Sequence, residues 1–158
     1  MNKAFVKEDD DNVAERLPDR AVSPHPNLVT AEGLALIGKM IVKLNEEHAA
    51  AKAADDVHAL ARIMRDLRYW NGRQATAQLT APPPGETVQF GSRVTFRRED
   101  GTMQTYRIVG IDEADPAQGC VSYVAPISQA LLTRKVGDEI QFGSTRAEIV
   151  DVNSAVNS

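Results

Sequence analysis

Two stripes of apolar residues at helical spacing constrain the fold of this chain most. The first stripe is Leu34, Ile37, Ile41 and Leu44, and the second is Val57, Leu60, Met64 and Leu67. Residues spaced three and four apart share one side of a helix, so each stripe is typical of a helix that packs against another. The pattern predicts an antiparallel two-helix hairpin within residues 28–80.

The ends of this hairpin carry helix-capping residues. Thr30 is suited to cap the first helix, and Glu32 lies in its first turn, where a carboxylate favours the helix dipole. The stretch between the stripes has no large apolar side chain, which places the turn near Ala53–Asp56. Asp55 or Asp56 can then cap the second helix. A hairpin this polar outside its seam is expected to present its tip to a partner.

The chain changes character after Leu79. Three consecutive prolines predict a stiff linker over residues 81–86. Alternating apolar residues then predict strands at 93–97, 103–109, 120–124, 139–142 and 145–150, with a short helix at 127–132. We expect an α+β protein, in which residues 87–152 form a small antiparallel-sheet domain with one short helix and 153–158 form a tail.

The first 27 residues are predicted to be a disordered acidic tail. Residues 8–11 are four consecutive acids, and Pro18, Pro24 and Pro26 disfavour helix. A solvated tail and an acidic contact for a basic partner are both compatible with this composition.

Charge and composition exclude several classes of protein. The net charge of −4 does not suit a protein that coats nucleic acid. Cys120 is the single cysteine, so no internal disulfide can form, which suits a reducing cytosol. No apolar run is long enough to cross a bilayer. We expect a soluble, cytoplasmic monomer with no membrane contact.

Few residues suggest chemistry. Phosphate-loop, nucleophile-elbow and zinc-spacing motifs are absent. The acids Asp55 and Asp56 fall at the predicted tip, with His48 and His58 on either side. Carboxylates suit Mg²⁺ and histidines suit transition metals, whereas a solvated turn with a capping aspartate needs no ion. We expect no metal site made by this chain alone.

The second predicted helix carries a row of arginines. These are Arg62, Arg65, Arg68 and Arg73, and the first three share a broad face. The row is either a solvated face with Asp66 as a local partner, or a patch that contacts phosphates or an acidic protein surface.

Three segments after the linker resemble the C-terminal domain of the Gre family of bacterial transcription elongation factors. They are residues 90–96, 106–115 and 125–139. The last matches the family pattern Ser-Pro-x-x-x-Ala-Leu-Leu-Gly-x-x-x-Gly-Asp at the proline, the Ala-Leu-Leu triplet and the Gly-Asp pair. Ala125 replaces the usual serine, and Thr133 replaces the usual glycine. Residues 30–34 and 69–73 also resemble parts of the family's coiled coil.

The resemblance implies a function that composition does not reveal. Gre factors bind bacterial RNA polymerase through an FKBP-like C-terminal domain and insert the coiled coil into its secondary channel. Two tip acids help to hold a Mg²⁺ ion shared with the polymerase, which then cleaves its own backtracked RNA. The factor is no enzyme itself, has no cofactor of its own, and meets nucleic acid only through the polymerase. The implied polymerase-binding residues here are Asp112, Asp115, Pro126, Ile127, Ala130 and Leu131.

The chain departs from the family at the tip. The family's Gly-Asp-x-Ser-Glu-Asn tip is absent, and each arm is shorter by roughly ten residues, or ~15 Å. We therefore expect regulation of paused or backtracked complexes with weak or absent transcript cleavage. One alternative is a regulator without cleavage, similar to the regulator of nucleoside diphosphate kinase. Another is a peptidyl-prolyl isomerase, for which the available aromatics are chiefly Phe96, Tyr106, Tyr123 and Phe142.

Overall fold

The chain divides into two compact units. The computed structural model describes residues 17–154. Residues 17–26 and Ala35–Thr76 form one group, here called the hairpin unit, and Asn27–Leu34 with residues 77–154 form the other, the sheet unit. The roots of both arms thus belong to the sheet unit, inside the predicted hairpin limits of 28 and 80. Residues 1–16 and 155–158 of the predicted tails lie outside the described residues.

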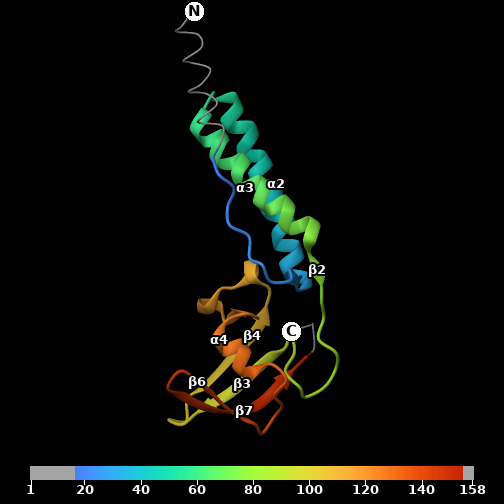
Figure 1. Cartoon of the computed structure of the whole chain (residues 1–158), viewed down its shortest axis with the longest axis vertical. Coiled ribbons are helices and arrows are strands. Elements are labelled where there is room, and N and C mark those ends of the chain that lie inside the picture. The colour runs from blue at the N-terminus through green and yellow to red at the C-terminus, as the bar shows by residue number, and fades with distance from the viewer. Residues whose placement is uncertain (1–16, 155–158) are drawn as a thin grey trace, which may run out of the picture. The chain divides into compact units, whose positions relative to one another are not determined.

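The predicted helical hairpin is confirmed. Helix α2 (Ala31–Ala53) and helix α3 (Val57–Thr76) are joined by a three-residue turn and run antiparallel (Figure 1). On α2 the buried positions Ile37, Leu44 and Ala51 follow one another at intervals of seven residues, which keeps them on one side of the helix. Across residues 17–154 no helix combines the length and apolarity needed to cross a membrane.

Burial on α3 does not follow the predicted stripe. Val57 and Met64 are 36% and 41% exposed, and Leu60 and Leu67 are half-buried. Ala61 and Trp70 are buried, but they are nine residues apart and therefore lie on opposite sides of the helix. The buried positions of α3 thus do not form a single stripe.

The sheet unit contains the predicted α+β domain. Its five strands lie in the order β5-β4-β3-β7-β6. Their bounds are β3 Arg93–Arg98, β4 Met103–Val109, β5 Cys120–Ser122, β6 Glu139–Phe142 and β7 Thr145–Asn153. Helix α4 (Pro126–Leu131) is the predicted short helix, and Figure 1 shows it against the sheet. Val94, Phe96, Ile108, Leu131 and Ile149 are fully buried in one core.

The sheet is mixed, where an antiparallel sheet was predicted. Strand β5 pairs parallel to β4, with Arg107 opposite Cys120. The intervening chain includes two 3-10 turns, η1 (Ile111–Glu113) and η2 (Pro116–Gln118), and turns back along β4 so that β5 begins opposite Arg107. Sequence periodicity shows a strand but not its direction, so it could not distinguish the two pairings.

Both flanks of the hairpin are more ordered than predicted. Strand β1 (Leu28–Val29) pairs parallel to β2 (Gln78–Leu79). In the linker, Pro82 packs so closely on Gly91 that a Cβ there would lie 2.7 Å from the proline ring. Residues 17–20, predicted to be disordered, make ion pairs with α3. Such contacts join residues distant in sequence, so local composition does not reveal them.

Candidate functional sites

The turn between α2 and α3 is a C-capping motif completed by aspartates. The amide of Asp56 donates to the carbonyl of Ala51 at 3.0 Å, and that of Asp55 donates to Lys52 at 3.2 Å. This is the Schellman pattern, whose penultimate position needs a left-handed backbone. Asp55 occupies that position with φ 53°. The turn therefore fixes the place of both acids.

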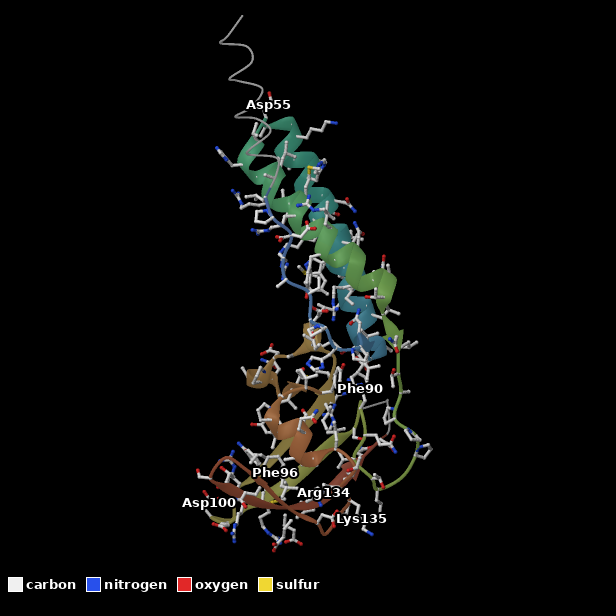
Figure 2. The ribbon with its side chains drawn as sticks, in the orientation of Figure 1. Asp55, Phe90, Phe96, Asp100, Arg134 and Lys135 are labelled. Carbon is white, nitrogen blue, oxygen red and sulfur yellow. The ribbon has the colours of Figure 1, made fainter. Side chains whose placement is uncertain are left out.

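The two tip acids have different roles. The carboxylate of Asp56 accepts a hydrogen bond from the amide of Ala59 at 3.1 Å, so it caps α3 as predicted. The backbone amide of Asp55 makes a hydrogen bond of the turn, and Asp55 is exposed at the tip (Figure 2). A carboxylate used as a cap has fewer lone pairs for an ion, so Asp55 is the better placed of the two to meet a partner's metal.

The structure assembles no metal site at the tip. Across residues 17–154, no three His, Cys, Asp or Glu residues are grouped so that they could hold an ion. His48 is half-buried on α2, and His58 is exposed on α3. The tip can therefore add a carboxylate to an ion held elsewhere, but the described residues offer no complete set of ligands.

The predicted basic patch separates into two parts. Arg62, Arg65 and Arg68 remain accessible on α3, whereas Arg73 is only 3% exposed. Arg65 pairs with Asp66 at 3.3 Å, as the solvated-face interpretation expects. Arg68 pairs instead with Asp19, at 2.6 Å. Arg73 thus has no place in a surface patch, because its position on the helix turns it into the interior.

The α4 segment holds four of the predicted polymerase-binding residues. Pro126 is exposed, and Ile127 and Ala130 are half-buried. Leu131 is completely buried in the sheet core, so it cannot contact a partner directly. Its match to the family pattern has a structural reason, because a short helix covers a sheet only through its apolar face.

At two positions beside α4 this chain lacks the residue of the family pattern, and the backbone shows what each of those family residues would contribute. Ala125 is the N-cap of α4 and makes no side-chain capping bond, which the usual serine could make. Thr133 has φ 70°, a conformation that glycine adopts without strain and a β-branched residue avoids. The chain therefore retains the geometry of this segment without two of the residues that favour it.

The loop before β5 carries the other two predicted contacts. Asp112 is half-buried in η1, and Asp115 is exposed before η2. The backbone of Asp115 pairs with that of Cys120, which fixes the loop to the edge strand. Both acids therefore lie on one loop beside the edge strand.

Glu113 is an important residue that the sequence interpretation missed. Its carboxylate accepts hydrogen bonds from the amides of Thr30 at 3.1 Å and Gly110 at 3.0 Å, and from the Thr30 hydroxyl. A Cβ on Gly33 would lie 2.1 Å from the carboxyl carbon, so glycine is needed for this approach. Thr30 also caps α2 through the Gly33 amide, as predicted. Glu113 thereby fixes the first turn of α2 in the sheet unit.

A second ionic contact lies at the same root. Glu32 pairs with Arg107 of β4 at 3.2 Å. Its own backbone amide, and then the Arg107 guanidinium, hold the pKa of Glu32 below its ordinary value of 4.5. The Thr-x-Glu-Gly motif thus supplies a cap, an ion pair and room for Glu113.

The family model for the transcription elongation factor GreA/GreB C-terminal domain matches residues 83–154. GreA of Sinorhizobium medicae is 34% identical over 146 residues, which cover 89% of this chain and 90% of that protein. GreA of Desulfovibrio desulfuricans is 35% identical over 106 residues, 65% of this chain and 64% of that protein. GreB of Neisseria meningitidis serogroup B is 38% identical over 81 residues, 49% of this chain and 50% of that protein.

The last two matches span about half to two thirds of those relatives, whereas the Sinorhizobium match is nearly complete. Among solved structures, the chain is similar to GreA factor homolog 1 of Thermus thermophilus, with 16% identity, a TM-score of 0.41, and coverage of 82% of this chain and 99% of that one. GreA/GreB from Nitrosomonas europaea gives 22% identity and a TM-score of 0.41, with coverage of 80% and 98%. On the strength of the near full-length match to a GreA, this chain belongs to the GreA/GreB family of transcription elongation factors.

Proposed function

We propose that this protein binds bacterial RNA polymerase through its sheet unit and inserts its helical hairpin into the secondary channel, where it regulates paused or backtracked complexes. Family membership supports the partner. The observation that carries the proposal is the hairpin itself, because α2 and α3 end in a defined turn that exposes an acid. The factor works on the polymerase in the cytoplasm, as a monomer, and is not an enzyme of its own.

The sheet unit supplies the docking surface in this proposal. The FKBP-like arrangement implied by the family places α4 on a curved sheet, and the exposed part of α4 begins at Pro126. Ile127 and Ala130 contribute their accessible edges, and Asp115 lies on the loop before β5. Leu131 contributes only by holding the helix in place.

The tip geometry supports weak transcript cleavage. Magnesium prefers oxygen ligands at ~2.0–2.1 Å, and when bound at the polymerase centre it activates water for phosphodiester hydrolysis. Asp55 can offer its carboxylate to that ion, whereas Asp56 is engaged as a helix cap. The helices have 23 and 20 residues, so each arm is only ~30–35 Å long. One available acid on short arms favours gating of the channel over efficient cleavage.

A regulator without any cleavage is the second candidate, and the engagement of Asp56 favours it. The isomerase alternative has less support. Phe96 is fully buried, and Tyr106, Tyr123 and Phe142 pack against the core. These aromatics contribute to the core of the sheet unit.

A backtracked elongation complex with labelled RNA tests the tip. Asp55→Asn retains a residue that tolerates the left-handed turn, and Asp56→Asn retains a good N-cap, so each variant removes mainly charge. We expect any residual cleavage to be lost in Asp55→Asn and kept in Asp56→Asn, with polymerase binding unchanged. Efficient cleavage that both variants abolish equally would show that the two acids act together and would contradict the proposed division of roles.

A polymerase pull-down with the full chain tests the docking surface. Pro126→Glu places a charge at the exposed start of α4, and Pro84→Glu is the matched control in the linker. We expect the first variant to lose binding and the second to keep it. Retention of binding by Pro126→Glu would exclude this end of α4 from the interface.

A further inference from the structure

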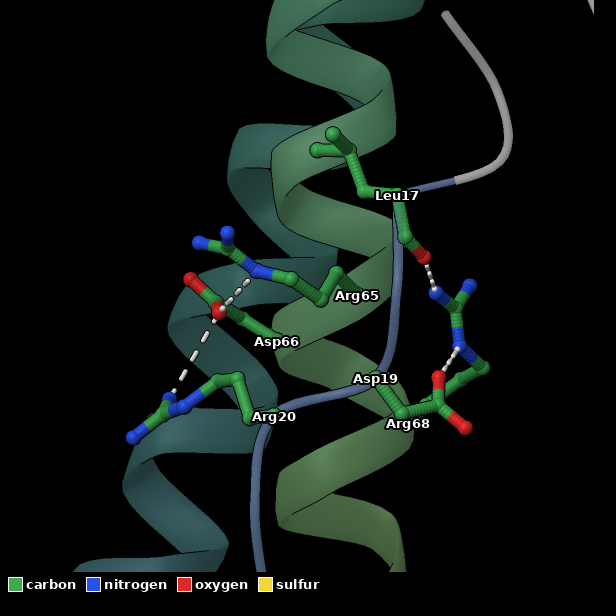
Figure 3. Close-up of polar contacts among 6 residues, drawn as sticks. All are labelled: Leu17, Asp19, Arg20, Arg65, Asp66 and Arg68. Atoms are coloured by element: carbon green, nitrogen blue, oxygen red, sulfur yellow. Dashed lines mark hydrogen bonds and ion pairs between the residues drawn. The ribbon is translucent and has the colours of Figure 1, made fainter. Parts of the chain in front are cut away.

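The residues just before the hairpin lie along helix α3. Residues 17–20, here called the strap, form no helix or strand in the structure. Figure 3 shows the strap running beside α3, where Arg68 donates to both Asp19 and the Leu17 carbonyl. The two distances are 2.6 and 3.0 Å. One arginine thus binds a carboxylate and a peptide carbonyl of the same extended segment.

Arg20, the next residue of the strap, is positively charged and contacts a different set of α3 side chains. Arg20 lies 3.5 Å from the Asp66 carboxylate. Its guanidinium carbon also lies 4.0 Å from the centre of the Tyr69 ring and 5.8 Å from that of Trp70. Arginine over an aromatic face is a favourable arrangement. The α3 surface therefore contacts an acid followed immediately by an arginine, each through a separate partner.

The strap is held mainly by accessible contacts. The side chains of Asp19 and Arg68 are 75% and 42% exposed, and Val22, which follows the strap, is 59% exposed. Ion pairs in such positions contribute about 0–1 kcal/mol and are screened by salt. Segments with few buried apolar contacts are the ones that open locally. Release of the strap would expose Arg68 and the Tyr69 face.

We propose that this α3 surface is a docking site for an extended peptide segment of a partner protein that carries an acid followed by arginine. The chain's own Asp19 and Arg20 occupy the site and must be displaced. Charge complementarity favours a peptide over nucleic acid, because Asp66 repels phosphate and the Tyr69 face takes a cation.

Trp70 is the only tryptophan, so its fluorescence reports on this site in the full chain. The probe is a blocked peptide with the sequence of residues 17–22, and the control peptide has Asn and Gln in place of its acid and arginine. The strap variant is Asp19→Asn with Arg20→Gln. Because the tethered strap competes with the probe and occupies its site for at least half of the time, we expect the probe to bind the variant at least about twofold more tightly than the wild type.

Three controls make the experiment decisive. Adding Arg68→Gln to the strap variant should abolish binding, whereas Arg97→Gln, an exposed arginine of the sheet unit, should not. Equal binding to wild type and variant, or binding of the neutral peptide, overturns the proposal. Binding of a short single-stranded RNA in place of the peptide also overturns it. If the strap variant fails to fold, acrylamide quenching of Trp70 fluorescence is measured in the wild type at low salt and at about 1 M salt. High salt weakens the ion pairs of the strap and should increase the quenching. Unchanged quenching would contradict a displaceable strap.

Discussion

The two units bury their apolar residues in different ways. In the sheet unit, Phe96, Ile108, Leu131 and Ile149 are fully buried around one centre. In the hairpin unit, Ile37 is similarly buried, but Met64 is 41% exposed. A sheet covered by a helix encloses its core, whereas two helices share one seam and leave their outer sides in water.

This difference assigns a separate task to each unit. The sheet unit has an enclosed core, so substitutions of the residues buried in that core should act on stability. The hairpin unit keeps its tip accessible, so substitutions at the tip should act mainly on the partner contacts proposed above. The departures from the family follow the same division, since those in the sheet unit concern backbone geometry and those at the tip concern chemistry.

The largest expected effect is in the sheet core. Leu131→Ala should destabilise the sheet unit by about 2–5 kcal/mol, because it leaves a cavity in a closed core. Met64→Ala, the matched change in the hairpin unit, should alter stability by less than about 0.5 kcal/mol because this side chain is already accessible. Urea unfolding with hydrogen exchange read separately on β3 and α2 measures both. Equal losses of stability in the two variants would show that the two units do not differ in how strongly they depend on these side chains.

The next effect concerns the root of α2. Glu113→Ala should cost about 1–3 kcal/mol, because the amides of Thr30 and Gly110 lose their acceptor. Glu99→Ala is the control, since Glu99 is exposed in the sheet unit. Urea unfolding of the two variants gives the difference. A loss no larger than that of the control would show that water replaces the carboxylate without cost.

Restoring the two family residues that flank α4 should stabilise the sheet unit. Thr133→Gly should stabilise the sheet unit by about 0.5–1 kcal/mol, because it relieves a positive φ at a β-branched residue. Ala125→Ser should add about 0.5–2 kcal/mol by supplying the missing cap. Thermal unfolding measures both gains. Loss of stability in Thr133→Gly would mean that the threonine makes contacts worth more than its strain.

The smallest effect is a pH dependence at the ionic root contact. The lowered pKa of Glu32 means that its ionised form stabilises the fold above its ordinary pKa of 4.5, and this contribution is lost as pH falls through the folded value. Glu32→Gln should therefore be less stable than the wild type at neutral pH and approach it in acid. Urea midpoints across this pH range provide the measurement. A constant difference at all pH values would assign the effect to packing.

The local elements of this fold were predictable from sequence alone. Apolar spacing predicted both helices, and period-two alternation predicted β3 and β4. Thr30 and Asp56 were recognisable as caps because a cap depends on residues only three positions apart. The position of the tip acids followed from the same local rules.

Tertiary structure alone decided the remaining features. The parallel pairing of β5, the burial of Arg73, the strap on α3 and the role of Glu113 all depend on which distant segments meet. Glu113 and Thr30 are 83 residues apart in sequence, and Asp19 and Arg68 are 49 apart. Periodicity records which side of an element is apolar, but it carries no information about the partner across that side, so only the folded chain could reveal these contacts.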